Sequence, residues 1–436
     1  MASRATLLRP APGFASTRCR ACSASAEIAL VRELALTYHP PAFTLASASV
    51  WSAHTVAVSP EISVVVSTYQ RPGHLRRCLA SLAVQQGVAG RFEVIVVDDG
   101  SRDETPDIVD EARRKGVFPL KFCTHPHDGF QLARCRNAGI RASTAPYLLF
   151  TDGDCIFPPD HLRRHLDARR PGVVRAGDCI RLDEPTSRQI DEAAVRSGAF
   201  LRLIEPRAQR SLRKTHLKSL IYQLARDRRR PKLVGWNMAV WRDQLERING
   251  FDERFRGWGC EDDDVALRLR MTGARVATAL GYTHAYHLWH PPHATTPLAW
   301  GDGANVAYFR RPAVLARCLE GIRSRSLAQV STRVIGSPQQ PELSRRLQHV
   351  FRESASGTEL ELLVWPNDAG FSSRGACRLL VLRRDAAAPA AVARRAQAVV
   401  RLEQIDSVPA MLDSIQRAVC GRGEDGGAEG RPGRAA

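Results

Sequence analysis

Short apolar runs alternate with amphipathic stretches between residues 61 and 152. The first run, Ile62–Thr68, is β-branched, as expected for a buried strand of a parallel sheet. In the stretch 75–86, which follows a turn, leucines recur at helical spacing. The same alternation then predicts strands at 92–97, 120–123 and 146–150 and helices at 103–114 and 131–142. This order of elements is typical of an α/β layered sheet, which binds its ligands at the carboxyl ends of the strands.

Polar residues gather at three of those carboxyl ends, at 68–71, 98–101 and 152–154. In the last group Asp152 and Asp154 lie one residue apart, so on an extended chain they point to the same side. Two carboxylates held side by side repel each other, and a divalent cation with oxygen ligands relieves this. Gly153 allows a group such as a diphosphate to approach the backbone. The alternative is a polar turn that caps a strand, which an isolated Asp-Gly-Asp would favour.

Residues 155–232 are less regular, and their second half is strongly basic. Between residues 201 and 232 only Glu205 and Asp227 oppose a large set of cations: Arg202, Arg207, Arg210, Arg213, Lys214, Lys218, Arg226, Arg228, Arg229, Arg230 and Lys232. The segment could hold a phosphorylated or otherwise anionic acceptor, or lie on an acidic membrane face. A solvated helix and loop would explain it equally well.

The chain becomes apolar and aromatic again after residue 233. We expect a strand, a helical turn, an Asn-Gly-Phe-Asp break and a second helix at 234–241, 242–248, 249–252 and 265–272. Four acids, 261–264, precede the second helix and suit the positive end of its dipole. Four are more than capping requires, and the glycines and Trp258 ahead of them indicate a shaped pocket.

Four histidines then follow at intervals of three: His284, His287, His290 and His293. Two prolines among them favour a loop over a helix. Near paired carboxylates, one of the four is a candidate metal ligand.

The two ends of the chain carry weaker signals. Beyond residue 312 we expect a small α/β appendage with helices at 343–351, 388–402 and 408–419 and strands at 359–365 and 377–382. The Gly- and Arg-rich residues 421–436 should be disordered. The first 58 residues are rich in Ala, Ser and Arg and form either a poorly ordered or an accessory extension, the start of which has a transit-peptide-like composition.

Composition narrows the class of protein. With 436 residues and 44% hydrophobic residues the chain can form two or three domains, and it has no apolar run long enough to span a membrane. Eleven cysteines without a regular framework, including the lone pair Cys19 and Cys22, indicate free thiols in a reducing, cytoplasmic compartment. The net charge of +18 favours anionic partners, and a peripheral contact with the inner membrane face fits it. A nucleic-acid-binding protein would also be basic, but we find no recognition module.

Four segments resemble, in order, the family 2 glycosyltransferases of the GT-A fold: 64–71, 96–101, 133–140 and 150–154. Residues 235–270 look like the galactosyltransferase C-terminal module, with its Asn-Gly-Phe break and Gly-Trp-Gly-x-Glu-Asp-Asp run. The resemblance covers roughly residues 60–310. It implies an α/β GT-A fold, which is Rossmann-like with a mostly parallel sheet and helices on both faces, plus the small C-terminal α/β appendage.

The resemblance also implies a division of the chain. Residues 59–232 would be the nucleotide-sugar-binding half of the GT-A domain, with the basic segment as an insert. Residues 233–312 would be its acceptor and catalytic half. An accessory region, 313–420, and the tail, 421–436, would follow.

The resemblance assigns roles to individual residues. Donor binding would fall to Thr68, Tyr69, Arg71, Asp99, Arg136, Asn137 and Asp152. Asp154, with Asp152 and His287, would bind Mn²⁺ or Mg²⁺, and His290 is the alternate histidine. Glu261 and Asp262 would be the acceptor-side acids, with Asp262 as the catalytic base, and Trp258 would stack under the acceptor sugar.

The implied activity is that of a metal-dependent, inverting hexosyl- or N-acetylhexosaminyltransferase in polysaccharide biosynthesis. It would move a sugar from a nucleotide donor, most simply a UDP sugar, to a glycan, cell-envelope or lipid-linked acceptor. A Gln-x-x-Arg-Trp motif is missing, which argues against processive polymerisation of the cellulose type, and Cys260 stands where the related module often has glycine. The second enzyme class considered, a nucleotidyltransferase, should carry a Gly-rich loop with a cation after the first strand, and residues 69–73 are a poor version of one.

Overall fold

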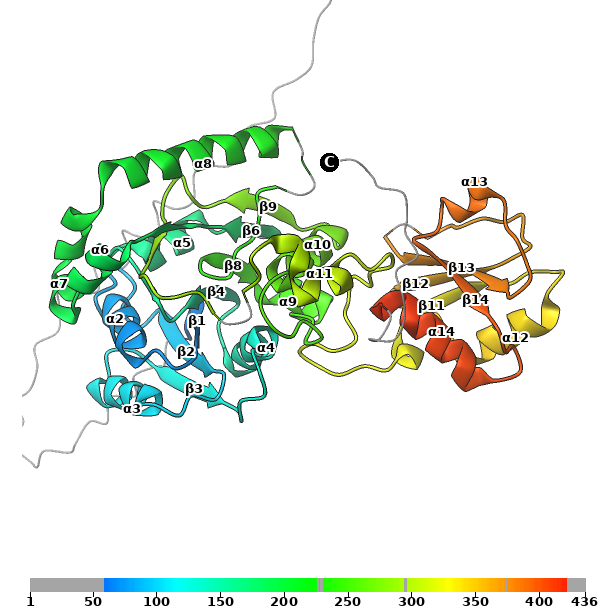
Figure 1. Cartoon of the computed structure of the whole chain (residues 1–436), viewed down its shortest axis with the longest axis horizontal. Helices are drawn as coiled ribbons and strands as arrows, with labels where there is room; N and C mark the ends of the chain where they lie inside the picture. Colours follow the sequence, from blue (N-terminus) through cyan, green and yellow to red (C-terminus); the bar gives the residue numbers. More distant parts are fainter. Residues whose placement is uncertain (1–58, 226, 228–229, 294–295, 374, 422–436) are drawn as a thin grey trace, which may run out of the picture. The chain divides into compact units, whose positions relative to one another are not determined.

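The structure is a computed structural model that describes residues 59–421 apart from 226, 228, 229, 294, 295 and 374 (Figure 1). The expectations for residues 1–58, with their Cys19 and Cys22 pair, and for residues 422–436 lie outside the described residues. Among the described helices, none is long and apolar enough to cross a membrane.

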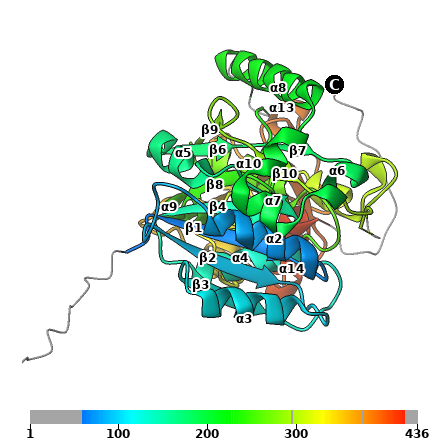
Figure 2. The same ribbon diagram turned by 90° about the vertical axis from the view of Figure 1, so that its left-hand side faces the viewer.

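A seven-stranded sheet forms the centre of the larger domain (Figures 1 and 2). Its order is β3-β2-β1-β4-β8-β6-β9. Only β8 runs antiparallel to its neighbours in this sheet, and every other pairing is parallel. The strands are β1 Ile62–Thr68, β2 Phe92–Asp98, β3 Leu120–Thr124, β4 Tyr147–Asp152, β6 Val173–Ala176, β8 Met238–Trp241 and β9 Arg275–Thr278.

Helices cover both faces of this sheet. Alternate residues of β1 face opposite ways: Val64 and Val66 pack in a core with leucines of α2, whereas Val65 packs in a second core. The first core includes α2 Pro72–Ala83, α3 Thr105–Lys115 and α5 His161–Ala168. The second includes α4 Leu132–Ala142, α9 Arg242–Ile248 and α10 Glu261–Met271. The expected fold class, a mostly parallel α/β sheet with helices on both faces, is confirmed.

A second, small sheet begins with the strand that follows the carboxyl end of β4. It consists of β5 Cys155–Ile156, β10 Ala285–His287 and β7 Cys179–Arg181, in the order β5-β10-β7. In it His287 is the register partner of Cys155, so the histidine segment lies beside Asp154. The irregular stretch before residue 225 contains, besides these strands, α6 Glu184–Gln189, α7 Glu192–Ser197, the 3-10 helix η1 Ala199–Leu203 and the long helix α8 Pro206–Leu224.

The C-terminal region has a parallel sheet of its own in the order β11-β12-β13-β14. Its elements are β11 Thr332–Ile335, α12 Pro341–Val350, β12 Leu360–Val364, β13 Cys377–Arg383, α13 Ala390–Ala393, β14 Ala398–Leu402 and α14 Val408–Cys420. In the sequence between β10 and β11, the chain forms η2 Trp300–Asp302, α11 Ala304–Phe309 and η3 Leu327–Gln329. The expected α/β appendage is confirmed, and its apolar core is separate from the two cores of the larger sheet.

One predicted helix of the appendage, 388–402, is wrong. Only α13 is helical there, and Ala398–Leu402 is the edge strand β14. Ala398, Val400 and Leu402 are buried while the residues between them are exposed, which is the period of two of a strand with one face covered. The alanine-rich stretch before it concealed this change of period.

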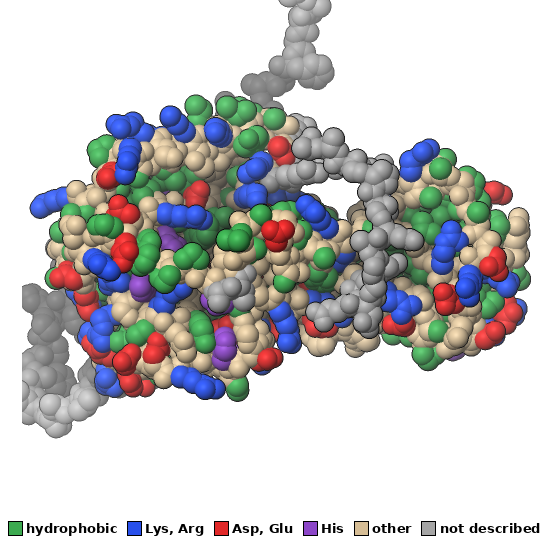
Figure 3. All heavy atoms as spheres, viewed as in Figure 1, with side chains coloured by type: hydrophobic (Ala, Val, Ile, Leu, Met, Phe, Trp, Pro, Cys, Tyr) green, Lys and Arg blue, Asp and Glu red, His purple; other side chains and the backbone are tan. Residues whose placement is uncertain are grey.

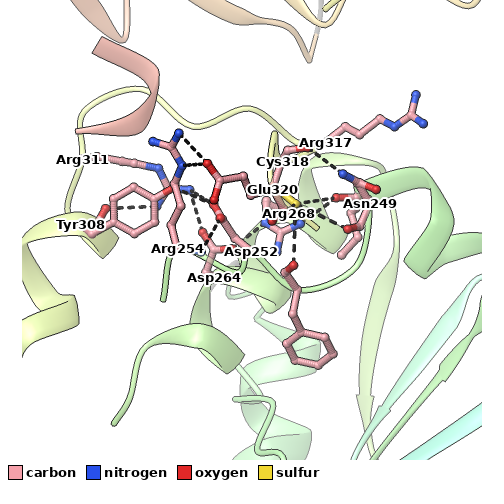
Figure 4. A network of polar contacts seen from close by, with 12 residues as sticks. Asn249, Asp252, Arg254, Asp264, Arg268, Tyr308, Arg311, Arg317, Cys318 and Glu320 are labelled. Carbon is pink, nitrogen blue, oxygen red and sulfur yellow. Dashed lines mark hydrogen bonds and ion pairs between the residues drawn. The ribbon is translucent and has the colours of Figure 1, made fainter. Parts of the chain in front are cut away.

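Helix α10 is anchored by a buried network of charges (Figure 4). Arg268, fully buried, donates to Asp264 at 2.6 Å and to the carbonyl oxygens of Ile248 and Gly250 at 2.8 Å each. Arg311 donates to the other oxygen of Asp264 at 2.9 Å. The network fixes the first two turns of α10 against the Asn-Gly-Phe break, and so it fixes the acids that open this helix.

Replacing Arg268 by alanine should therefore destabilise the protein by about 3 kcal/mol, because a buried carboxylate and two buried carbonyls lose their donor. Arg247→Ala is the matched control, since Arg247 pairs with Asp243 at the same i,i+4 spacing but both side chains are more than half exposed. That loss should cost less than about 0.5 kcal/mol. Urea unfolding of both variants gives the comparison, and equal costs would contradict the anchoring role of Arg268.

Candidate active site

A single buried guanidinium, that of Arg136 on α4, joins the acids at the end of β4 to those at the start of α10. Its Nη1 donates to Asp262 Oδ1 at 2.7 Å and lies 3.4 Å from Glu261 Oε1. Its Nη2 lies 3.5 Å from Asp152 Oδ1. Asp152 and Asp262, which are 110 residues apart in the chain, thus lie at one site.

This arrangement requires glycine at position 235. A Cβ built on Gly235 would lie 1.6 Å from Arg136 Nη2, so any side chain there would displace the guanidinium. The backbone N–H of Gly235 also donates to Asp262 Oδ2 at 2.7 Å. Both oxygens of Asp262 are therefore oriented, one by Arg136 and one by Gly235.

Two carboxyl groups of this site, those of Asp152 and Glu261, have pKa values raised to near neutral pH. Burial raises the pKa of Asp152 to about 7 against the attraction of Arg136. Burial and the neighbouring charge of Asp262 raise the pKa of Glu261 to about 7 as well. Burial also raises the pKa of Asp262, with Arg136 opposing. Glu261 Oε2 is buried and has no hydrogen-bond partner among the described residues.

Asp154 lies on the other side of Asp152 and faces two histidines and an arginine. His290 Nε2 is 3.1 Å from Asp154 Oδ2, and His287 Nε2 is 3.4 Å from Oδ1. Arg71 Nη1 donates to Oδ2 at 3.1 Å. The ligand atoms of Asp154, His287 and His290 all lie within 4.8 Å of one another, which suits a divalent cation.

The charges around Asp154 keep it ionised. Burial alone would raise the pKa of Asp154, but the hydrogen bond from His290 and the nearby His287 and Arg71 lower it well below its usual range. Burial lowers the pKa of His287, which favours the neutral imidazole that a metal requires. The sequence left His287 and His290 as alternatives, and the structure places both against Asp154.

At the end of β1 and β2 the structure assembles a second polar group. Tyr69 stacks on His127 with ring centroids 4.4 Å apart. Asp99 Oδ2 accepts from the N–H of Gln131 at 3.0 Å, and Asp99 Oδ1 is 3.4 Å from His125 Nε2. The flat Tyr69 face and the buried Asp99 carboxylate suit a planar, hydrogen-bonding ring such as a nucleobase. Thr68 lies beside them, its Oγ1 3.1 Å from a Cβ built at Gly153.

His125 and His127 also belong to this group, although neither was expected there. Both follow β3 directly, at the same edge as the other polar residues, so their position was an available signal. A second cluster with metal-ligand geometry results, formed by Asp99, His125 and Cys135. The Cys135 thiol is buried, which raises its pKa.

Two other predicted site residues lie differently from one another. Asn137 is fully buried, and its amide bonds to the backbone of Phe251 and to Glu253 Oε1, so in this structure it holds the Asn-Gly-Phe break. Its donor contact stays a prediction. Trp258 is 40% exposed on the loop before α10, where an acceptor could reach it. Cys260, which follows this loop, has a left-handed backbone (φ 71°), the conformation that glycine adopts most easily.

Comparison with known proteins matches two segments of the chain to families. Residues 63–174 match the family described as Glycosyl transferase family 2. Residues 215–291 match a family described as the N-terminal domain of galactosyltransferase. This range contains the whole of the module expected at 235–270, which the sequence analysis named a C-terminal module.

Individual relatives are glycosyltransferases. A validoxylamine A glucosyltransferase of Streptomyces hygroscopicus subsp. jinggangensis is 33% identical over 227 residues, which cover 49% of this chain and 52% of the relative. An Escherichia coli chondroitin synthase is 26% identical over 258 residues, covering 56% of this chain and 37% of the synthase. The match thus spans about half the length of the first of these relatives. Among solved structures, Staphylococcus aureus TarS in complex with UDP-GlcNAc aligns with 57% of this chain and 64% of its own, with a TM-score of 0.39 and 16% identity.

The metal cluster makes a direct prediction for Mn²⁺ binding. Asp154→Asn and His290→Ala should each weaken Mn²⁺ binding at least about tenfold, because the first removes the negative charge of the carboxylate ligand and the second removes the imidazole ligand. His284→Ala is the matched control, since His284 lies three residues before His287 and bonds instead to the Tyr286 hydroxyl. Titration followed by electron paramagnetic resonance reports free and bound Mn²⁺. If Asp154→Asn left Mn²⁺ binding unchanged, or if Cys135→Ser weakened it as much, the metal site would instead be the cluster of Asp99, His125 and Cys135.

Proposed function

Because this chain carries a glycosyl transferase family 2 domain, we propose that it is a metal-dependent, inverting glycosyltransferase that uses a nucleotide sugar, with UDP as the nucleotide. The observation that carries the proposal is the Arg136 bridge. This guanidinium contacts both Asp152, at the end of β4, and Asp262, at the start of α10. The cluster of Asp154 with His287 and His290 lies next to them.

Donor recognition falls to the residues at the ends of β1 and β2. Tyr69 would support the base and Asp99 would accept its N–H, while Thr68 would line the ribose. Arg136 and Arg71 supply positive charge beside Asp152 and Asp154, where a diphosphate would lie.

Asp154, His287 and His290 would hold the cation, with Asp152 next to them. When bound, a divalent cation supplies Lewis-acid stabilisation of the departing nucleoside diphosphate. Two imidazoles beside one carboxylate suit a transition metal such as Mn²⁺ better than Mg²⁺, which prefers oxygen ligands.

Asp262 would take the proton from the attacking hydroxyl of the acceptor. Arg136 and the Gly235 N–H hold its two oxygens in place, and each oxygen keeps a further lone pair. Its raised pKa suits a general base that works near neutral pH. One displacement from the face opposite the leaving group inverts the anomeric carbon, so an α-linked donor gives a β-glycoside.

The acceptor would be a hydroxyl of a glycan or of a lipid-linked or other cell-envelope compound. The names of two relatives, a validoxylamine A glucosyltransferase and a chondroitin synthase, support sugar transfer to an acceptor of this kind. Trp258, exposed in front of Glu261, gives a face on which a sugar ring can stack.

The test is release of nucleoside diphosphate from a panel of UDP-, GDP- and dTDP-sugars, with Mn²⁺ and with chelator. A UDP sugar should be turned over only with the cation. Activity that survives the chelator would contradict the metal, and a preference for GDP sugars would contradict the donor.

In the same assay Asp262→Asn should lower turnover about 10²- to 10⁴-fold while leaving donor affinity nearly unchanged, because the base acts only on the acceptor. Asp263→Asn is the matched control, since Asp263 is the next residue of α10 and its carboxylate lies 3.7 Å from Lys232 Nζ. A loss of donor affinity as large as the loss of turnover would contradict the base assignment. If Glu261→Gln alone abolished turnover, the base would be Glu261.

A further inference from the structure

Helix α8 exposes apolar side chains that a solvated helix would turn inward. Leu217, Leu220, Ile221 and Leu224 follow the spacing i, i+3, i+4, i+7, which places them on one face. That face points away from the protein: Leu217 is 60% exposed, Ile221 55% and Leu224 84%. Of the twelve large exposed apolar side chains among the described residues, five lie on this helix.

The opposite face of α8 packs on the domain: Ala208 and Leu212 pack on an apolar core in its first half, and polar side chains make the contacts in its second half. Ser219 is the only buried residue of the helix. Gln223 Oε1 accepts from the N–H of Thr278 on β9 at 2.9 Å, and His216 lies against Gly281. In the second half of the helix the amphipathic pattern is therefore inverted, since polar side chains face the domain and apolar side chains are exposed.

The same helix is positively charged over residues 207–218, whereas its last turn carries no cation. It carries Arg207, Arg210, Arg213, Lys214 and Lys218 and no acidic residue. On the helical wheel Arg210 and Arg213 share the outward face with the leucines, and Lys214 and Lys218 flank it. Figure 3 shows blue side chains along the edge formed by α8 and green ones toward its C-terminal end.

We propose that α8 docks this protein on an anionic lipid bilayer, with its apolar face inserted among the acyl chains. Exposed leucines with flanking arginines and lysines are the composition of an interfacial helix. The leucines supply the insertion, and the cations supply attraction to acidic headgroups while their long stems reach the interface.

Charge distinguishes this occupant from a second copy of the chain. A symmetric dimer through α8 would bring together two helices that each carry five cations and no acid to offset them. An anionic surface meets both properties of the face at once. The helix packs on β7, the strand that pairs with β10 and therefore with His287, so the docked surface belongs to the catalytic domain.

Co-sedimentation with lipid vesicles tests the proposal on the full chain. The protein should bind vesicles that contain about 30% phosphatidylglycerol in phosphatidylcholine far more strongly than vesicles of phosphatidylcholine alone. Binding should weaken as NaCl rises from about 0.1 M to about 1 M, because screening removes the electrostatic share.

Two variants separate the apolar and the charged contributions. Leu217→Gln, Leu220→Gln, Ile221→Gln and Leu224→Gln together should lower the vesicle partition coefficient at least tenfold, with α8 kept helical because glutamine is a good helix former. Val117→Gln with Val399→Gln removes exposed apolar side chains elsewhere and should change nothing. Arg210→Ser, Arg213→Ser and Lys218→Ser should abolish the preference for the anionic lipid, whereas Arg114→Ser, Arg345→Ser and Arg394→Ser, which are exposed elsewhere, should keep it.

Donor hydrolysis and circular dichroism accompany each variant and should match the unsubstituted protein, which shows that the domain is folded. Equal vesicle binding by the glutamine variant and the unsubstituted protein would overturn the proposal. So would failure of the unsubstituted protein to bind anionic vesicles, or a dimer in solution that the glutamine variant converts to a monomer.

Discussion

The arrangement of the candidate site depends on one buried cation. Arg136 is 1% exposed, and its guanidinium stands among Asp152, Glu261 and Asp262. Burial alone would lower the pKa of Arg136, but the three carboxylates raise it, so the group stays charged. Without this charge, three carboxylates would lie close together in a buried site. Their mutual repulsion would then separate the start of α10 from the end of β4.

Several distant parts of the sequence exist in this form to support that bridge. Position 235 must lack a side chain for the guanidinium to fit, and the strand β8 that follows it pairs antiparallel with β4. Behind the acids, Arg268 and Arg311 hold the first turn of α10 through Asp264. The glycine-rich loop before α10 is fastened by Asn305, whose amide donates to the carbonyl oxygens of Gly257 and Gly259. The acids are thus carried on rigid elements, which a catalytic constellation requires.

The sequence sufficed to predict the first half of the fold, because strands buried on both faces leave long apolar runs and the helices between them keep a clear period. It also placed the polar groups at the carboxyl ends of β1, β2 and β4. It failed where elements are short. The three-residue strands β7 and β10 owe their existence to pairing across more than a hundred residues, and no local pattern reveals such pairing.

Individual site contacts were the least predictable part. Arg71 was expected near the base, and in this structure it pairs with Asp154. Asn137 was expected near the donor and is occupied by the backbone of Phe251. Both outcomes depend on which loop passes above the residue, and residues 249–253 and 287–290 arrive there only through the tertiary fold. The exposure of the apolar residues 217–224 of α8 was not predicted for the same reason. A helical wheel shows two faces of a helix but not which of them packs on the protein.

Anomalous diffraction at the manganese edge, from crystals soaked with Mn²⁺ and a non-hydrolysable UDP sugar, tests the account most directly. We expect one strong peak beside Asp154, His287 and His290, with the sugar between Asp152 and Asp262. A peak at Asp99, His125 and Cys135 instead, or a sugar bound away from Arg136, would contradict it.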